Sequence, residues 1–465
     1  MTLQLHDSLT GTKRPFEPKQ PGQVSLYVCG MTVYDYCHIG HARSLLAFDM
    51  IVRYLRFSGY QVNFVRNITD IDDKIIRRAQ ELGEDWQQLV ERFINAMHED
   101  ERALGIAAPD HEPRATQHIE QMIDIIQSLM DKGVAYVSEE GDVCFAVEKF
   151  EEYGKLSGRD IEQLQAGARI QDDRGKHNPL DFVLWKPVKP GEPAWDSPWG
   201  AGRPGWHIEC SAMSKTLLGL PFDIHGGGMD LKFPHHENEI AQSEAADCCG
   251  FANYWMHSGL LNVEGEKMSK SLGNFLTIRD ALENYSSEQI RFFMLSSHYG
   301  SPVNFSQQQM EQAQASLERL YTALRDVDDV QEPLDNESAK PYCDAFSAAM
   351  DDDFNTPEAF AVFFQLAKAI NKAKDDGNQA LAARLASVLK QLGAVLHLLQ
   401  DDPVLFLQGD ASAADVEQIE QLIAERKQAK ADKNWTRADE IREQLKVMQV
   451  ELEDSGDKTS WRFVK

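Results

Sequence analysis

Two cysteines and two histidines lie within eighteen residues of sequence in YVCGMTVYDYCHIGHARS, which runs from Tyr27 to Ser44. Cysteine thiolates and histidine nitrogens are common zinc ligands, so this stretch allows a metal site. Histidines beside a glycine at the start of a helix can instead bind phosphate, and an ordinary strand-turn-helix would need neither chemistry. The segment alone leaves these three interpretations open.

The phosphate interpretation depends on His38-Ile39-Gly40-His41, which follows a short apolar run and begins a helical pattern. Free backbone N–H groups and the positive end of a helix dipole favour an anion at such a position. Gly40 lets a nucleotide approach the backbone, and both imidazoles can donate to phosphoryl oxygens as charge develops. An isolated motif of this kind is equally compatible with histidines that cap the helix or pack in a core.

A second candidate for polyphosphate chemistry is Lys267-Met268-Ser269-Lys270-Ser271, between Gly265 and Gly273. Two lysines and two hydroxyls on a loop can follow a departing polyphosphate and neutralise its charge. By itself such a segment is usually a solvated loop. It comes about 230 residues after His38 with strand and helix patterns between them, and this combination favours a single nucleotide site.

The glycine run Gly226-Gly227-Gly228-Met229-Asp230 follows an apolar run that is expected to be a strand. Glycines there allow close backbone approach, and Asp230 could accept hydrogen bonds from ribose hydroxyls, as acidic residues do in dinucleotide-binding folds. The alternative is a tight turn without a ligand.

The elements that would position these residues alternate between strand and helix in the first third of the chain. Val24 to Cys29 and Gln61 to Arg66 are expected to be strands, and His41 to Leu55 has helical apolar spacing. Strand, helix and strand within about forty residues form a βαβ unit, which favours a parallel sheet. Further helices are expected over Asp85 to Arg102 and Thr116 to Lys132.

After residue 132 the composition and the apolar spacing of the chain change several times. Proline, glycine and tryptophan are dense between 133 and 205, which indicates a small inserted subdomain, and from about Ser306 to Leu399 the pattern is helical. The last residues include a probable strand, Trp461 to Val464. We therefore expect an α/β fold: a Rossmann-like parallel-sheet catalytic domain in two halves (1–132 and 206–305) around the insert (133–205), a helical bundle (306–402) and a small C-terminal α/β domain (403–465).

Composition narrows the class of protein. The 465 residues are 42% hydrophobic, Met1 to Pro21 lacks the apolar stretch of a signal peptide, and no apolar run is long enough to cross a membrane. Seven scattered cysteines indicate a reducing compartment, so we expect a cytoplasmic protein. A net charge of −27 argues against general nucleic-acid affinity, although Gln421 to Lys465 has ten basic and nine acidic residues.

The metal interpretation needs ligands from distant parts of the chain. Neither Cys29 nor Cys210 belongs to a CxxC pair, so the usual zinc-finger spacing is absent. In HHENE, however, His235 and Glu239 are four residues apart and would share one helix face, whereas the residue four after His236 is Ile240, which cannot ligate. A set of two cysteines, one histidine and one glutamate is therefore available, although each cysteine alone is equally explained as a buried core residue.

Together the two phosphate motifs resemble those of class I aminoacyl-tRNA synthetases, in which both motifs hold ATP. The resemblance is closer to the cysteinyl-tRNA synthetases, and it rests on CGMTVYDYCHIGHARS, GWHIECSAM, GGGMDLKFPHHENE, GEKMSKSLGN and DDDFNTPEA, spread over Cys29 to Ala359, with WTRADEIR in the tail. It implies cysteine, ATP and the cognate tRNA as partners, no membrane, one zinc ion per chain, Mg²⁺ with ATP, and a monomer.

The resemblance also assigns roles to individual residues. The implied catalytic residues are His38, His41, Lys267 and Lys270. The implied ATP-binding residues are these four with Gly40, Gly227, Asp230 and Ser269. The amino-acid pocket would contain Thr32, Trp206, His207 and His225, although Trp206 and His207 are equally explained as core residues. Zinc would be held by Cys29, Cys210, His235 and Glu239; because zinc prefers thiolate to hydroxyl, it would select cysteine over serine.

The tail contains a candidate RNA contact. Arg426, Lys430, Lys433 and Arg437 are spaced by four, three and four residues, which predicts one helix face, and Trp435 beside them could stack on an unpaired base. The alternative is a solvated helix paired through Asp432, Asp439 and Glu440. The resemblance favours anticodon contact, above all by Arg426, Lys430, Trp435 and Arg437.

The expected activity is therefore ATP-dependent ligation of cysteine to tRNA through a cysteinyl-adenylate. One rival is a small-molecule cysteine ligase built on the same core, similar to the mycothiol-pathway enzyme, which would have no use for a basic, tryptophan-bearing tail. A second rival is a zinc-dependent RNA-binding protein without catalysis, which would need neither the histidine pair nor the lysine pair.

Overall fold

A computed structural model of the chain describes residues 2–159, 175–247, 249–267, 275–331, 333–334, 336–409, 413–455 and 458–463. The chain divides into two compact units: one contains residues 1–310 and 345–360, and the other contains residues 311–344 and 361–465. Among the described residues, none of the helices is long and apolar enough to cross a bilayer.

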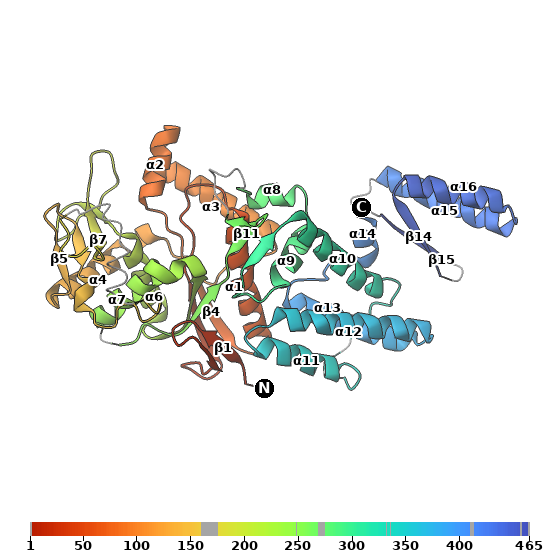
Figure 1. The fold of residues 1–465 in the computed structure, drawn as a ribbon, viewed down its shortest axis with the longest axis horizontal. Coiled ribbons are helices and arrows are strands. Elements are labelled where there is room, and N and C mark those ends of the chain that lie inside the picture. The colour runs from red at the N-terminus through yellow and green to blue at the C-terminus, as the bar shows by residue number, and fades with distance from the viewer. Residues whose placement is uncertain are drawn as a thin grey trace. The chain divides into compact units, whose positions relative to one another are not determined.

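A four-stranded parallel sheet forms the centre of the first unit, which confirms the expected Rossmann-like fold class (Figure 1). Its strand order is β10-β9-β3-β4, and its strands are β3 (Gln23–Val28), β4 (Gln61–Arg66), β9 (Phe222–Gly228) and β10 (Ala252–Ser258). Val28 pairs with both Gly226 and Arg66, so the strands end together at one edge of the sheet. In parallel sheets this carboxyl edge is where ligands bind.

Helix α1 (Ile39–Phe57) connects β3 to β4 and packs on the sheet through a nearly continuous buried face. It begins two residues before the expected start because His38 caps its first turn, and it ends at Phe57, with Ser58 as its C-cap before Gly59, whose φ is 90°. The close packing of α1 requires a glycine on the sheet: a Cβ at Gly226 would lie 2.3 Å from the ring of Phe48.

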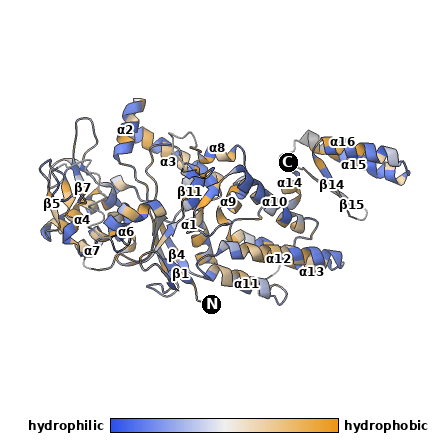
Figure 2. Cartoon of the chain, in the orientation of Figure 1, coloured by the Kyte–Doolittle hydropathy of each residue, from blue (hydrophilic) through white to orange (hydrophobic). Residues whose placement is uncertain are grey.

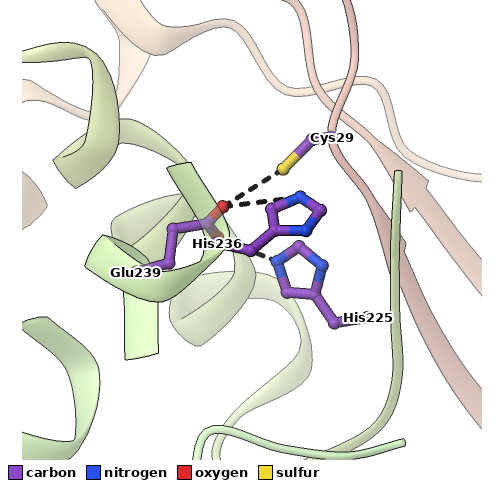
Figure 3. A group of neighbouring side chains, drawn as sticks. All are labelled: Cys29, His225, His236 and Glu239. Carbon is purple, nitrogen blue, oxygen red and sulfur yellow. Dashed lines mark hydrogen bonds and ion pairs between the residues drawn. The ribbon is translucent and has the colours of Figure 1, made fainter. Parts of the chain in front are cut away.

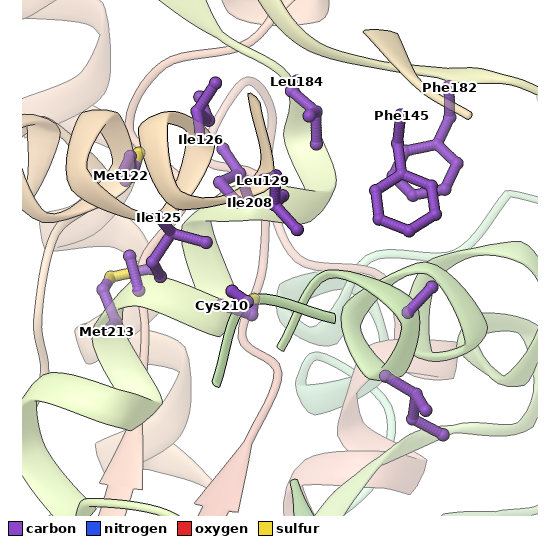
Figure 4. Close-up of a cluster of buried hydrophobic side chains, with 14 of the residues drawn as sticks. Met122, Ile125, Ile126, Leu129, Phe145, Phe182, Leu184, Ile208, Cys210 and Met213 are labelled. Carbon is purple, nitrogen blue, oxygen red and sulfur yellow. The ribbon is translucent and has the colours of Figure 1, made fainter. Parts of the chain in front are cut away.

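The remaining helices of the first half are α2 (Asp73–Leu82), α3 (Trp86–Ala103) and α4 (Ile119–Asp131). A separate antiparallel sheet follows in the order β5-β6-β7-β8, with strands β5 (Ala135–Val137), β6 (Val143–Phe145), β7 (Phe182–Pro187) and β8 (Gly202–Pro204). Its buried side chains share one hydrophobic core with α4 and with α6 (Trp206–Leu218), as Figure 4 shows for Ile126, Leu184, Ile208 and Cys210. The inserted region therefore packs directly against the helix that carries Cys210.

After β9 the chain makes a short helical turn (Met229–Leu231) and a kinked turn (Lys232–His236) before α7 (Glu237–Asp247). Smaller strands complete the first unit: the hairpin β1 (Gln4–Asp7) with β2 (Thr12–Pro15), and the sheet of β11 (Leu261–Val263), β12 (Glu266–Lys267) and β13 (Val303–Phe305). Helices α8 (Ile278–Leu282) and α9 (Ser287–Leu295) lie between β12 and β13 in the sequence.

The chain from 307 onward is largely helical, as the sequence predicts. Its helices are α10 (Gln307–Leu324), α11 (Lys340–Asp351), α12 (Thr356–Asp375), α13 (Gln379–Val395), α14 (Pro403–Gln408), α15 (Ala413–Ala431) and α16 (Trp435–Val447). Figure 2 shows hydrophobic and hydrophilic residues interspersed along α12 and α13, as expected for helices with one buried face. Strands β14 (Val450–Ser455) and β15 (Lys458–Phe463) form a hairpin that packs on α15 and α16 through Ile419, Ile441 and Trp461.

The expectation that Arg426, Lys430, Lys433 and Arg437 share one helix face is wrong. Helix α15 ends at Ala431, Lys433 has a φ of 59°, and Asn434 caps the start of α16 by accepting a hydrogen bond from the N–H of Arg437. Arg437 and Trp435 therefore lie on a different helix from Arg426 and Lys430. A helical spacing does not continue through a residue with a left-handed backbone.

Candidate active site

A cavity of about 400 Å³ opens at the carboxyl edge of the parallel sheet. The β3–α1 connection, the start of α6, the end of β9 and the β10–β11 connection all contribute to its wall. Among its lining residues are Cys29, Thr32, His38, Gly40, His41, Lys74, Trp206, Gly228, Asp230 and Ser258 to Leu261. Predicted metal, amino-acid and ATP residues thus meet in one space.

His38 and His41, the two histidines of the HIGH segment (residues 38–41), cap the first turn of α1 by a reciprocal pair of hydrogen bonds. The N–H of His41 donates to Nδ1 of His38 over 3.3 Å, and the N–H of His38 donates to Nδ1 of His41 over 3.2 Å, with the rings stacked at 3.5 Å. Burial and the neighbouring His38 and Lys74 hold the pKa of His41 well below its usual value. Because a neutral ring that accepts at Nδ1 carries its proton on Nε2, each ring presents an Nε2–H donor.

Residues 275–278, which follow the KMSKS sequence, are hydrogen-bonded to the segment that contains His38 and His41. The N–H of Ile39 donates to the carbonyl of Leu276 and the N–H of Ile278 donates to the carbonyl of Cys37, each over 2.9 Å. Phe275 also packs edge-on against His38 at 5.5 Å. Lys267 ends β12 opposite Asn262, whereas its side chain and the predicted residues Ser269 and Lys270 lie outside the described residues.

The four predicted metal ligands converge from four separate elements. Sγ of Cys29 lies 3.5 Å from Sγ of Cys210 and 3.3 Å from Oε1 of Glu239, and that oxygen lies 3.1 Å from Nε2 of His235. A tetrahedral zinc ion with ligand bonds of about 2.0–2.3 Å places its ligand atoms roughly 3.3–3.8 Å apart. The separations between these donor atoms therefore fit such an ion.

The electrostatics of Glu239 and Cys210 suit a cation. Burial alone would raise the pKa of Glu239, but His225 and His235 hold it well below its usual value. Burial likewise opposes ionisation of Cys210, while hydrogen bonds with Cys29 and His235 bring its pKa to about 6. Burial instead raises the pKa of Cys29 well above its usual value, and the pKa of His235, which burial alone would lower, is raised to about 10 by Glu239 and Cys210. An ionised thiolate and an ionised carboxylate are the forms that bind zinc.

A second candidate group overlaps the first and contains Cys29, His225, His236 and Glu239 (Figure 3). The i,i+4 spacing favours His235, but Nε2 of His236 also comes within 3.9 Å of Oε1 of Glu239 at a spacing of three residues, so the spacing alone does not separate the two histidines. Nδ1 of His236 is however 2.9 Å from Nε2 of His257, and Nε2 of His225 is 2.8 Å from Oε2 of Glu239. The bond to Oε2 suits His225 to orienting Glu239 from behind, whereas His236 approaches Oε1, the oxygen that also contacts Cys29.

The other predicted residues separate into two groups. Thr32 and Trp206 line the cavity, and the ring of Trp206 lies 4.2 Å from that of His235. His207 contacts Nδ1 of His235 over 2.9 Å, and His225 is fully buried, so neither belongs to the cavity wall. Of the glycine run, Gly228 and Asp230 line the cavity, whereas Gly227 packs against the ring of His236.

Sequence reasoning missed two residues that follow β4. Oδ1 of Asn67 accepts the N–H of Gly30 over 2.8 Å and lies 3.7 Å from Sγ of Cys210, and Lys74 lines the cavity. A Cβ at Gly30 would lie 1.7 Å from the carbonyl oxygen of Asn67, so the two strand ends touch there. The polar run NITDIDDK directly after a parallel strand was the signal, since such strand ends meet at the ligand edge.

The tail presents a separate groove of about 1200 Å³ between α15 and α16. Trp435, which is 62% exposed, and Arg437 line it together with acidic residues that include Asp439 and Glu443. Arg437 pairs with Glu425 and Glu440 at 3.2 Å each. The predicted contacts Arg426, which is buried, and Lys430 are not part of this groove.

Three successive parts of the chain match known protein families. Residues 15–315 match the family described as tRNA synthetases class I (C) catalytic domain, residues 345–400 match the DALR domain, and residues 416–462 match the cysteinyl-tRNA ligase anticodon binding domain. A cysteine–tRNA ligase of Halorhodospira halophila is 57% identical over 460 residues, covering 99% of each chain. The chain belongs to the cysteine–tRNA ligase family.

Other members are equally similar over the full length. The cysteine–tRNA ligase of Tolumonas auensis is 57% identical, with 99% of each chain covered, and that of Coxiella burnetii is 56% identical, with 99% of this chain and all of the relative covered. Membership in this family confirms the class that the motifs indicated.

Solved structures share the fold at low identity. Methionyl-tRNA synthetase of Mycobacterium tuberculosis in complex with methionyl-adenylate superposes with a TM-score of 0.56 at 17% identity, covering 86% of this chain and 94% of that one. A LeuRS from Agrobacterium radiobacter superposes with a TM-score of 0.59 at 11% identity, covering 83% and 87%. The cysteine–tRNA ligase family thus shares its overall fold with synthetases for other amino acids.

Proposed function

We propose that this chain ligates L-cysteine to its cognate tRNA through a cysteinyl-adenylate. One observation carries this proposal: Cys29, at the end of β3, and His38 and His41, at the start of α1, line the same cavity. A thiol-selecting end and a phosphate-binding end in one cavity bring the cysteine carboxylate next to the α-phosphate. Such proximity is the main requirement for adenylate formation.

The ATP end would act by electrostatics and positioning. The Nε2–H groups of His38 and His41 would donate to the α-phosphoryl group as its charge grows, beside the helix N-terminus at Gly40. Asp230 would accept from the ribose, with Gly227 supporting the strand end behind it. Lys267, Ser269 and Lys270 would hold the leaving pyrophosphate, and Mg²⁺ bound to ATP would offset its charge.

The cysteine end would hold one zinc ion through Cys29, Cys210, His235 and Glu239. A zinc ion there supplies affinity for the substrate thiolate over the serine hydroxyl. Thr32 and Trp206 would contact the rest of the amino acid, and His207 and His225 would hold His235 and Glu239 in place. X-ray absorption at the zinc edge should show one added sulfur neighbour when cysteine binds and no change with serine; the same spectrum with both amino acids would contradict this role.

The tail would contact the anticodon of the tRNA. Trp435 offers an exposed ring for stacking on a base, and Arg437 in the same groove supplies positive charge, with Lys430 on the preceding helix; Arg426 is buried and would support that helix from within. Because tRNA charging takes place in the cytoplasm, we also place the protein there, acting as a monomer.

The deciding experiment measures two reactions with one preparation. Cysteine-dependent ATP–pyrophosphate exchange tests adenylate formation, and charging of bulk tRNA with labelled cysteine tests transfer. Exchange without charging would indicate a small-molecule cysteine ligase, and the absence of both would contradict a catalytic role. His41→Asn keeps an acceptor for the N–H of His38 but loses the Nε2–H donor, so we expect exchange to fall about 100- to 1,000-fold without loss of stability.

A further inference from the structure

The motif DDDFNTPEA, which the proposed chemistry does not use, contains a strained turn in the first unit. Asp353 and Phe354 both have left-handed backbones, with φ of 61° and 54°, and neither is a glycine. Such conformations are unfavourable for consecutive residues with side chains and persist only where the surroundings enforce them. The contacts of this turn therefore indicate what it holds in place.

The side chain of Asp353 is buried and bonded to two separate segments. Its Oδ1 accepts the N–H of His6 and the hydroxyl of Tyr299, each over 2.9 Å, and its Oδ2 lies 3.3 Å from Nε2 of His298. His298 also contacts the backbone carbonyl of Asp353 over 2.8 Å. The left-handed backbone thus directs one carboxylate at the turn formed by residues 298–301.

Arg43 holds the same turn through its backbone carbonyls. This buried guanidinium lies two residues after His41 on α1, and it donates to the carbonyls of His298, Tyr299 and Ser301 at 2.6, 3.0 and 3.0 Å. Three carbonyls bonded to one cation fix the path of the backbone. The turn is therefore clamped between the HIGH helix and the carboxylate of Asp353.

The clamped turn supports the wall of the cavity. The N–H of Gly259 donates to the carbonyl of Tyr299 over 2.8 Å, and a Cβ at Gly259 would lie only 2.1 Å from the carbonyl oxygen of Ser301. Gly259 lines the cavity together with Ser258, Leu260 and Leu261, beside the residues proposed to bind ATP. A shift of the turn would move this part of the wall.

We infer that Asp353 is a positioning residue for the nucleotide end of the cavity, acting through Tyr299 and Gly259. The inference rests on the proposed function for the assignment of that end to ATP. It implies that loss of the carboxylate weakens ATP binding and leaves the cysteine end unchanged, because the carboxylate bonds His6, His298 and Tyr299 and none of the four predicted zinc ligands.

The central variant is Asp353→Gly, because glycine adopts the left-handed backbone without strain and so removes only the carboxylate. We expect the Kd for ATP, measured by calorimetry without cysteine, to rise about 3- to 30-fold, as for residues that act through a neighbour. In pyrophosphate exchange the KM for ATP should rise similarly, while the KM for cysteine changes less than about twofold. Asp353→Asn, which keeps Oδ1 as an acceptor for both donors, should restore most of the lost affinity.

The matched control is Asp352→Gly, which alters the neighbouring exposed aspartate that pairs with Lys13 at 2.6 Å. It should lower stability slightly and leave both KM values unchanged. If Asp353→Gly does not fold, Tyr299→Phe removes only the bonded hydroxyl and should produce the same selective loss of ATP affinity. Unchanged ATP binding, or equal changes in both KM values, would overturn the inference. Absence of exchange in the unaltered protein would instead count against the proposed function, while calorimetry still tests Asp353.

Discussion

Nε2 of His225 lies 2.8 Å from Oε2 of Glu239, and both side chains are completely buried. The other oxygen of Glu239 faces Cys29 and His235, so the carboxylate is held on one side and presented on the other. The ring of His225 is itself fixed by stacking on Trp255 at 4.3 Å. A histidine first assigned to the amino-acid pocket thus has the geometry of a support for the metal group.

Replacing His225 by phenylalanine should weaken metal retention. The ring would still stack on Trp255, but Oε2 of Glu239 would lose its donor, and such supporting contacts typically contribute about 10- to 100-fold to metal affinity. Zinc content after dialysis against a series of chelator concentrations measures the effect. Ser8→Ala, at the far end of the partly buried contact between His257 and Ser8 (2.8 Å), is the control and should retain zinc normally. Equal retention in all three proteins would contradict the supporting role of His225.

Gly226→Ala should destabilise the first unit. The added methyl would meet the buried ring of Phe48 at 2.3 Å, and overpacking of this kind costs about 1–3 kcal/mol. Urea unfolding measures the loss, and combining the change with Phe48→Leu should recover part of it. At Gly250 the nearest atom to an added Cβ is 4.0 Å away, so Gly250→Ala should unfold like the unaltered protein. If the two alanine variants were equally stable, the close approach of α1 to β9 would not limit the packing.

The pH dependence of stability should contain a contribution from Asp100. Burial raises the pKa of Asp100 to about 6, although Arg279, 2.8 Å away, opposes the shift. Because the folded pKa exceeds the unfolded value, this carboxyl stabilises the fold most below about pH 4, and the contribution is lost as the pH rises to 6. As the pH rises over this range, the unfolding free energy of Asp100→Asn should therefore increase relative to that of the unaltered protein, by on the order of 1–3 kcal/mol.

Chemical unfolding at several pH values between 4.5 and 7.5 measures this difference. Glu99→Gln removes a neighbouring negative charge that helps to raise the pKa of Asp100, so in this variant the loss of stability should move to lower pH. A constant offset between Asp100→Asn and the unaltered protein over the whole pH range would contradict the raised pKa of Asp100.

Trp435→Ala should affect tRNA and leave adenylate formation intact. Stacking of a base on an aromatic ring is worth about 1–3 kcal/mol, so the KM for tRNA in charging should rise roughly 5- to 150-fold. Pyrophosphate exchange should be unchanged. Leu405→Ala alters another exposed apolar side chain, 67% exposed and outside the groove, and should charge tRNA normally. A loss of exchange in Trp435→Ala would show that the substitution acts through stability and not through RNA.

Local structure followed the sequence closely. β4 spans the same residues that its apolar pattern predicts, and α1 is two residues longer than expected at each end, at its start because of a cap that the pattern does not reveal. These features depend on hydrogen bonds and side chains a few residues apart, which periodicity reports directly. The error in the tail has the same origin: spacing continued through Lys433, but a single left-handed residue there reverses the chain.

The sequence by itself determined the elements, the family motifs and the residue types available for zinc and ATP. Only the tertiary structure decided which of those residues form the metal group, which support it and which line the cavity. It brought Cys29 to within 3.5 Å of Cys210, placed His225 behind Glu239, and clamped the turn at 298–301 between Arg43 and Asp353. The physical reason is sequence separation: these contacts join residues far apart in the chain, and their distances depend on strand order and helix packing, which no local pattern encodes.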